Sequence, residues 1–254
     1  MTTDVEQRDG GGVQVLARAG QILRYLAGHS SGVAQLQIAK DLGLPRSTVH
    51  RLLNALAAEG LVDPLGSSGR FRIGNDIVAM AGAARNALVS EIHAHLVALS
   101  EEVGETVDLS TADRAQMTFI DQVVAPNRLR AVSMVGASFP MHCTANGKAV
   151  LATMSDREIA RRLPGELQRL TGHTRDLPAL LDEIVRIRSE GYAIDDEEHH
   201  EGICAIGVAL VGTPLGEAAI SIPMPATRFA AKKTAASAAL IKTARRIESG
   251  WNAP

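Results

Sequence analysis

Apolar residues repeat at helical spacing in two short stretches that are separated by a turn. In the first stretch, Ile38 and Leu42 lie four positions apart and therefore share one helical face. In the second, residues 45–59, the apolar positions recur at intervals of three and four and form one stripe: Val49, Leu52, Leu53 and Leu56. The pattern predicts two short helices that pack against each other.

The residues between these stretches favour a close crossing of the two helices. Ala39 is small enough for a second helix to pass nearby, and Gly43 can adopt the left-handed conformation that ends a helix. Pro45 suits the first turn of the next helix, because its missing N–H would have no partner there. The combination is typical of a helix-turn-helix, which makes DNA the first partner to consider.

The opposite face of the second helix is polar. Arginine can bind guanine through two hydrogen bonds, asparagine can do the same with adenine, and hydroxyl groups bind phosphate. A solvated face on an ordinary helical hairpin is the alternative. The candidate DNA contacts are Arg46, Ser47, Thr48, His50, Arg51 and Asn54.

Two alternating stretches follow this helix, at residues 61–63 and 70–73, with the turn sequence GSSG between them. This is a β-hairpin pattern, and directly after a recognition helix it predicts a wing. Arg70 and Arg72 lie two positions apart, on the same side of a strand, where they could follow a phosphate backbone. A surface hairpin with incidental arginines is the alternative.

The flanking segments predict further helices. Residues 13–27 read as a helix that packs under the pair. Asn75 is a candidate N-cap for a helix over residues 76–88, which is rich in small and apolar residues. Such a helix needs a partner, so we expect it to link two domains and to contribute to a dimer. A plain core helix is the alternative reading.

The remaining residues predict an α+β domain, a mostly antiparallel sheet with helices packed on it. Helices are expected at residues 90–103, 145–153, 156–163, 177–190 and 227–248. Strands are expected at residues 106–111, 117–124, 129–135, 191–195, 203–211 and 217–222.

Charge is divided unevenly along the chain. The 254 residues hold 26 Lys and Arg and 28 Asp and Glu, a net charge of −2. Residues 13–75 carry seven basic and three acidic residues, whereas residues 76–254 carry 18 and 22. A basic head on an acidic body is the asymmetry expected of a DNA reader joined to another domain.

Composition narrows the class of protein. With 46% hydrophobic residues, the length allows two domains with their own cores. No secretory leader or membrane-spanning run is evident, and two cysteines do not make a disulfide framework. We therefore expect a cytoplasmic protein without a membrane partner. Residues 1–12 are polar and rich in glycine, and we expect them to be disordered.

Two segments of the second domain could bind a ligand. Residues 140–149 lead from a loop into a helix, whose free N–H groups would suit a carboxylate. Thr144 could instead merely cap that helix, with the small residues there packing tightly. In the acidic run at residues 195–198, one carboxylate could point into a cavity, although such runs are usually solvated.

Three other functions stay open on the residues alone. His142, Cys143, His199, His200 and Cys204 could hold a metal, which would make the protein a metal-sensing regulator, but their spacing matches no strong metal motif. Cys143 beside His142 could serve an enzyme, although no third group is seen to orient them. A DNA-binding architectural protein without an effector is the last alternative. We expect no cofactor and no enzymatic activity.

Several runs together resemble the IclR-type bacterial transcription regulators. They occur in the family's order and cover residues 13 to 249. The runs are AKDLGLPRSTVHRLLNALAAEGLV, GRFRIG, LSEEVGETVDL, FPMHCTANGKAVLA, IVRIRSEGYAIDDEE and AAISIP.

The resemblance implies a winged helix-turn-helix at residues 13–75, a linker helix at 76–89 and a GAF-like effector-binding and oligomerisation domain at 90–254. It also implies a homodimer or homotetramer on a palindromic operator, and a small organic acid or aromatic effector. The effector would meet backbone amides of Ala145, Asn146 and Gly147, next to Met141 and Thr144. Asp195, Ala205 and Ser221 map to other pocket positions of the family.

The chain departs from that family pattern at two places. Some members have a ligand-binding cysteine where this chain has Ala205, and Cys204, one residue earlier on a strand, would face away from the pocket. A second pocket serine is replaced by Pro223. The loss of both polar groups favours a bulkier or more apolar ligand than glyoxylate.

Overall fold

The computed structural model describes residues 9–251, which divide into two units, one ending at Arg85 and one beginning at Asn86. The boundary lies inside the helix α4 (Asn75–Val103), within the segment expected to link the domains. None of the helices in this described part has the length and hydrophobicity needed to cross a bilayer.

The first unit is a helix-turn-helix with a small antiparallel sheet. Its helices are α1 (Asp9–Ala27), α2 (Gln35–Asp41) and α3 (Arg46–Ala58). Its strands are β1 (Val33–Ala34), β2 (Val62–Leu65) and β3 (Arg70–Ile73), in the order β1-β3-β2, with the turn η1 (Gly66–Ser68) joining β2 to β3. The expected wing is therefore present.

The core of this unit contains the apolar stripe expected from the sequence. Val49, Leu52, Leu53 and Leu56 of α3 are buried against α1, α2 and the sheet. Gly43 has a φ of +64°, which agrees with its expected place at the end of α2. Pro45 lies one residue before α3, as its N-cap, rather than inside the first turn.

One expectation at the N-terminus needs correction. Helix α1 begins at Asp9, so residues 9–12 are helical rather than disordered. The glycines there have low helix propensity, and their helical state could not be read from composition. Residues 1–8 of the expected disordered tail lie outside the described part of the chain.

The second unit is built on a six-stranded antiparallel sheet in the order β6-β5-β4-β9-β8-β7. The strands are β4 (Val107–Asp113), β5 (Gln116–Val123), β6 (Ser138–Pro140), β7 (Ala193–Asp196), β8 (Ile203–Leu210) and β9 (Ala218–Pro225). The helices besides α4 are α5 (Ala145–Ala152), α6 (Asp156–Arg162), α7 (Leu177–Glu190) and α8 (Ala226–Trp251), and a short turn η2 (Met141–Cys143) precedes α5. The expected α+β class is confirmed.

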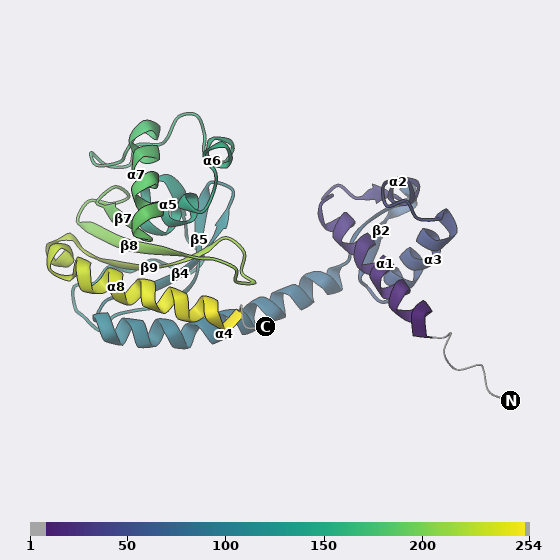
Figure 1. Ribbon diagram of the computed structural model, residues 1–254, viewed down its shortest axis with the longest axis horizontal. Coiled ribbons are helices and arrows are strands. Elements are labelled where there is room, and N and C mark those ends of the chain that lie inside the picture. Colours follow the sequence, from purple (N-terminus) through teal and green to yellow (C-terminus); the bar gives the residue numbers. More distant parts are fainter. Residues whose placement is uncertain (1–8, 252–254) are drawn as a thin grey trace. The chain divides into compact units, whose positions relative to one another are not determined.

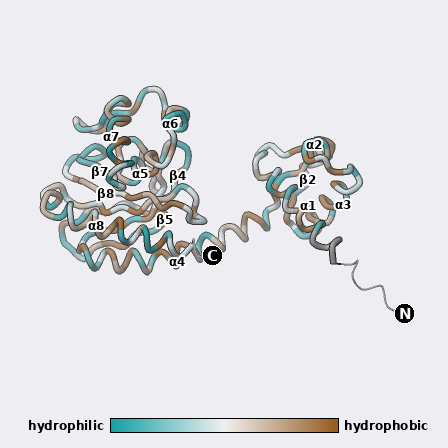
Figure 2. The backbone as a smooth tube through the Cα atoms, viewed as in Figure 1, coloured by the Kyte–Doolittle hydropathy of each residue, from teal (hydrophilic) through white to brown (hydrophobic). Residues whose placement is uncertain are grey.

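Helices cover both faces of this sheet (Figure 1). The C-terminal half of α4 and α8 pack on one face, where Ile206 and Ile220 belong to the core, and α5, α6 and α7 pack on the other. Because side chains alternate along a strand, Ala205 and Ser221 face the α5 side. Brown apolar stretches follow the strands of the sheet in Figure 2.

Two element predictions in this unit were wrong. Residues 76–88 and 90–103 form one continuous helix, because nothing local to Val89 and Ser90 breaks it. Residues 129–135 pair with no strand of the described sheets, although their side chains alternate as in a strand: Ala131 and Ser133 are buried, and Val132 and Met134 are exposed. Alternating burial of side chains shows that the backbone is extended along a surface. It does not show that the segment pairs with a strand, because pairing also needs a free edge of a sheet.

Candidate functional site

The outer face of α3 is exposed and polar. Arg46, Ser47, His50, Arg51 and Asn54 are all exposed, and Thr48 is half-buried. Arg46 and Arg51 form no ion pair with any described residue. An unpaired guanidinium on an exposed helix is free to bind phosphate or guanine.

His50 and Asn54 are linked to each other on this face. The Asn54 Nδ2 lies 3.2 Å from the His50 Nε2, and the His50 Nδ1 lies 3.3 Å from the Gln35 Oε1 of α2. These contacts order both side chains on the surface. Gln35, which sequence analysis did not single out, joins the polar face because α2 and α3 cross there.

The two arginines of the wing already have protein partners. The Arg70 Nη2 donates to the carbonyl oxygens of Ser31 at 3.2 Å and Gly32 at 2.6 Å. Arg72 forms an ion pair with Asp63 across the β2–β3 ladder, with 3.5 Å between Nη2 and Oδ2. Both side chains are exposed on one side of β3, as expected, but Arg70 also fixes the loop before β1.

The second unit contains a cavity of about 280 Å³ on the α5 side of its sheet. Six of the eight residues expected at the effector site line it: Thr144, Ala145, Asn146, Asp195, Ala205 and Ser221. The structure thus brings six of these positions together around one cavity.

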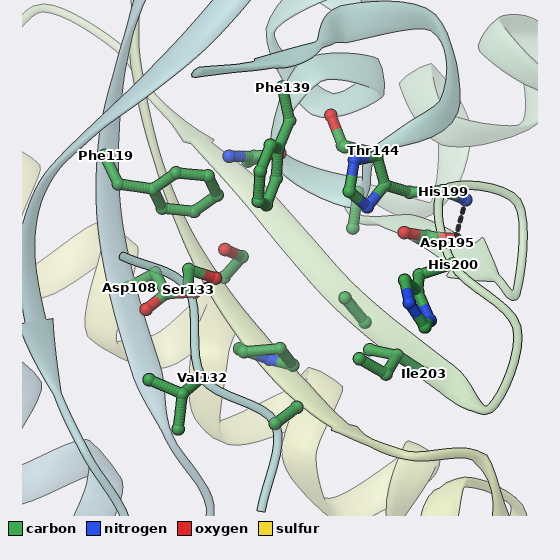
Figure 3. Close-up of a pocket in the computed structure, with 16 residues that line it drawn as sticks. Asp108, Phe119, Val132, Ser133, Phe139, Thr144, Asp195, His199, His200 and Ile203 are labelled. Atoms are coloured by element: carbon green, nitrogen blue, oxygen red, sulfur yellow. Dashed lines mark hydrogen bonds between the residues drawn. The ribbon is translucent and has the colours of Figure 1, made fainter. Parts of the chain in front are cut away.

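Strand register builds the floor of the cavity. Asp108 of β4 pairs with Ser221 of β9, and Asp195 of β7 pairs with Ala205 of β8, which in turn pairs with Pro223. All five side chains point into the cavity. Asp108 and Asp195 are three strands apart, roughly 15 Å, and mark opposite ends of the cavity (Figure 3).

Aromatic side chains form one wall. The rings of Phe119 and Phe139 meet edge to face with 5.0 Å between their centroids. Phe139 stacks on His199 with 4.2 Å between the ring centroids (Figure 3). Burial lowers the pKa of His199, with His200 and His142 adding to the effect, so the neutral ring is favoured. The wall is suited to a flat apolar molecule.

Met141 and Gly147 lie outside the cavity, contrary to expectation. A Cβ atom at Gly147 would lie 2.3 Å from the Cα of Met141, so the glycine is needed for η2 to pack against α5. The small residues there allow tight packing, as the alternative reading of this segment held. The side chain of Thr144 donates to the carbonyl oxygen of Pro140 at 2.9 Å and makes no cap hydrogen bond to α5.

One of the three amides at the start of α5 has an acceptor within the protein. The Gly147 N–H donates to the Asn146 Oδ1 at 2.9 Å, and the Asn146 Nδ2 donates to the Ser110 hydroxyl at 2.8 Å. The backbone nitrogen of Asn146 packs against Gly207 of β8. The Gly147 N–H is therefore not free for a ligand, whereas the N–H groups of Ala145 and Asn146 donate to no described residue.

Both carboxyl groups of the cavity are buried. Burial raises the pKa of Asp195 to about 7, although the nearby Lys148 ammonium acts to lower it. Burial also raises the pKa of Asp108 to about 6. The Asp195 Oδ1 accepts the N–H groups of Glu198 and His199 at 2.8 and 3.3 Å. No described residue hydrogen-bonds to Asp195 Oδ2, and the same holds for the Ser221 hydroxyl.

A buried ion cluster lies behind the cavity. Lys148 of α5 is fully buried, and its Nζ lies 2.9 Å from the Glu183 Oε2 and 2.5 Å from the Glu198 Oε1. Arg175, on the protein surface, places its Nε 2.8 Å from the Glu183 Oε2. Lys148, the cation whose charge acts on Asp195, is thus paired with two other carboxylates.

The cysteines and histidines do not assemble a reactive or metal-binding centre in the described chain. Burial raises the pKa of the Cys143 thiol to about 12, which disfavours a nucleophilic thiolate. Cys204 faces away from the cavity, as expected, into the core beneath α8. It lies near Asp196 and Glu197, but none of the other four candidate ligands joins that group.

The sequence alone does not single out the cavity residues Phe119, Phe139 and Asp108 or the segment 131–133. A signal was present for one of them: Asp108 alternates with the apolar Val107 and Leu109, so a polar residue faces one side of a buried strand. The two phenylalanines had no such signal, because their meeting depends on the pairing of β5 with β6.

Comparison with known proteins covers both units. The family model for the IclR helix-turn-helix domain matches residues 15–66, and the model described as bacterial transcriptional regulator IclR C-terminal matches residues 80–249. The two matches leave only short segments of the chain uncovered.

Individual relatives match along nearly the whole chain. The HTH-type transcriptional regulator Rv1719 of Mycobacterium tuberculosis is 45% identical over 99% of this chain and 98% of its own. The HTH-type transcriptional regulator TtgV of Pseudomonas putida is 35% identical over 94% and 92%. The crystal structure of the Thermotoga maritima IclR is 27% identical, with a TM-score of 0.61 over 95% of this chain and 100% of that one.

Proposed function

Since the chain belongs to the IclR family of DNA-binding transcription regulators, which are not enzymes and carry an effector-binding C-terminal domain, we propose that it is a homo-oligomer that binds a palindromic operator in the cytoplasm and responds to a small organic acid or aromatic metabolite. In this proposal residues 13–75 bind DNA, residues 76–89 link the domains and residues 90–254 bind the effector.

The exposed α3 face is the observation that carries the DNA-binding part. Arg46 and Arg51 are exposed and unpaired among the described residues, so they contact base edges or phosphates in the major groove. Ser47, Thr48, His50 and Asn54 complete the contacts. Arg70 and Arg72 stabilise the wing and reach the phosphate backbone of the DNA. In a twofold dimer the half-sites lie about 34 Å apart.

The cavity on the α5 side is the proposed effector site. It holds two buried carboxyl groups, a free serine hydroxyl and an aromatic wall, the mixture of apolar lining and few polar groups that small-molecule sites have. Thr144, Ala145, Asn146, Asp195, Ala205 and Ser221 are the contacts in this proposal, with Phe119 and Phe139 added.

Exposed apolar residues support self-association. Residues 78–87 of α4 are all exposed although most of them are apolar, with Val78 at 63% and Met80 at 61%. Leu16 of α1 is 75% exposed. A second copy of the chain that covers these residues would remove a large apolar surface from water.

The DNA-binding part is tested by gel-shift titration of the full chain on the region upstream of its own gene. Arg51→Ala should weaken binding by about fivefold or more, because a bidentate arginine contact contributes about 1–3 kcal/mol. Arg245→Ala, which removes an exposed charge from α8, is the matched control and should leave binding unchanged. Equal affinities for Arg51→Ala and the unmodified protein would contradict the proposal.

A further inference from the structure

The charges that face the cavity limit the ligand it can hold. Asp108 and Asp195 line it, and no lysine or arginine of the described chain does. A carboxylate ligand entering this cavity would meet two acidic groups and no lysine or arginine, at the low effective dielectric of a buried site. An uncharged ligand avoids that cost.

The hydrogen-bonding groups that remain free point to a donor on the ligand. Asp195 Oδ2 has no partner among the described residues, while Oδ1 is held by two backbone N–H groups. The carboxyl group is thereby fixed with one acceptor oxygen facing the cavity. Asp108, in contrast, is occupied by Gln122 at 2.7 Å and Ser133 at 2.7 Å.

One of the three amide groups at the start of α5 that would attract an anion is used within the protein. The Gly147 N–H is bound by the Asn146 side chain, and the Asn146 nitrogen packs on β8. Lys148, the nearest cation, lies behind the cavity between Glu183 and Glu198. Its Nζ is paired with those two carboxylates and does not line the cavity.

From this arrangement we infer that the effector is an uncharged aromatic molecule with a hydroxyl group, a phenol or aromatic alcohol, that donates to Asp195 Oδ2 and places its ring against Phe119 and Phe139. The inference rests on the proposed effector pocket and selects the aromatic over the acidic class. A hydrogen bond to a buried carboxylate is among the stronger ones available.

Three probes of closely similar shape test the inference on the full-length protein by calorimetry at pH 8. They are 4-ethylphenol, which donates a hydrogen bond, 4-ethylanisole, which does not, and 4-ethylbenzoate, which is an anion. The unmodified protein should bind 4-ethylphenol at least tenfold more tightly than either of the others.

Two variants locate the recognition. Asp195→Asn keeps the oxygen that accepts the two N–H groups but removes the charge, so binding of 4-ethylphenol should weaken about tenfold and 4-ethylbenzoate should bind more tightly than before. Asp196→Asn is the matched control, because Asp196 is exposed and outside the cavity, and it should bind like the unmodified protein. Thermal melting of both variants confirms that they are folded.

Two outcomes overturn the inference while the pocket stands: tighter binding of 4-ethylbenzoate than of 4-ethylphenol, or an unchanged phenol preference in Asp195→Asn. A Kd above about 1 mM for all three probes would instead overturn the effector pocket itself, and with it the inference.

Discussion

The backbones of Gly207 and Ala145 are in direct contact: a Cβ atom at position 207 would lie 2.4 Å from the carbonyl carbon of Ala145. This contact seats α5 on β8 and so fixes the depth of the cavity. Gly207→Ala should destabilise the protein by about 1–3 kcal/mol, because the helix must move away from the sheet. Chemical denaturation measures the change.

Gly165→Ala is the matched control for this substitution. Gly165 has no atom within 4 Å of an added Cβ and does not have a positive φ, so the alanine should be neutral or slightly stabilising. Equal stabilities of the two variants would show that the α5–β8 contact can relax without cost.

Removal of the Lys148 charge should be strongly destabilising. Lys148→Met leaves the buried Glu183 and Glu198 with only the partly exposed Arg175 and Arg186 as cationic partners, and breaking a buried ion pair costs about 3–5 kcal/mol. The free energy of unfolding from urea titration gives the value.

The double variant Lys148→Met with Glu198→Gln separates charge from packing. Burial raises the pKa of Glu198, so the protein already disfavours its ionised form, and its Oε2 has no hydrogen-bond partner among the described residues. The double variant should therefore be more stable than Lys148→Met alone. A double variant that is less stable would mean that the methionine fails for steric reasons.

Asp195 should make stability depend on pH. Burial raises its folded pKa from 3.8 to about 7, so the folded protein holds this proton more tightly than the unfolded chain. The stabilisation is complete below about pH 4 and is lost as the pH rises through 7, a change of at most about 4 kcal/mol. The neighbouring ionisable groups are Lys148 of α5, Cys143 of η2, and Glu198, His199 and His200 after β7.

The measurement is the stability of the unmodified protein minus that of Asp195→Asn, from pH 4 to pH 8. Subtraction removes the contribution of the other titrating groups, which both proteins share. The difference should fall from pH 4 to about pH 7 and then level off, and a difference that stays constant would mean that Asp195 is not protonated in the folded state near neutral pH.

Self-association should depend on the exposed part of α4. Met80→Glu puts a charge among the exposed apolar residues 78–87, and sedimentation velocity should show a smaller assembly at the same concentration. Val185→Glu, at a 64% exposed valine of α7, is the control. An unchanged assembly for Met80→Glu would exclude this part of α4 from the interface.

The sequence predicted the first unit well because its signals are local. Gly43, Pro45 and the stripe from Val49 to Leu56 each specify conformation within a few residues, and the structure has the helices and the wing where these residues require them. Pro45 lies one position earlier than expected, as the N-cap of α3, and the error at residues 9–12 arose because glycine composition says little about a helix that is extended by its neighbours.

The cavity was predicted less completely, for a physical reason. Asp195, Ala205 and Ser221 came from a family resemblance, whereas their adjacency follows from the register of β7, β8 and β9, which connects residues far apart in sequence. Phe119 and Phe139 meet only through the β5–β6 pairing. Pairing between distant strands depends on the whole fold, and no window of the sequence contains it.

The unpaired segment at residues 129–135 also determines how a molecule reaches the cavity. No backbone amide in it donates a hydrogen bond within the described chain. Its main hydrogen bonds to other segments run from the Ser133 hydroxyl to Asp108 and from Arg228 to the Leu129 carbonyl oxygen. Displacing this wall would break a few hydrogen bonds and expose Ala131 and Ser133, while every strand stays paired. Opening of the cavity is thus separable in free energy from melting of the sheet.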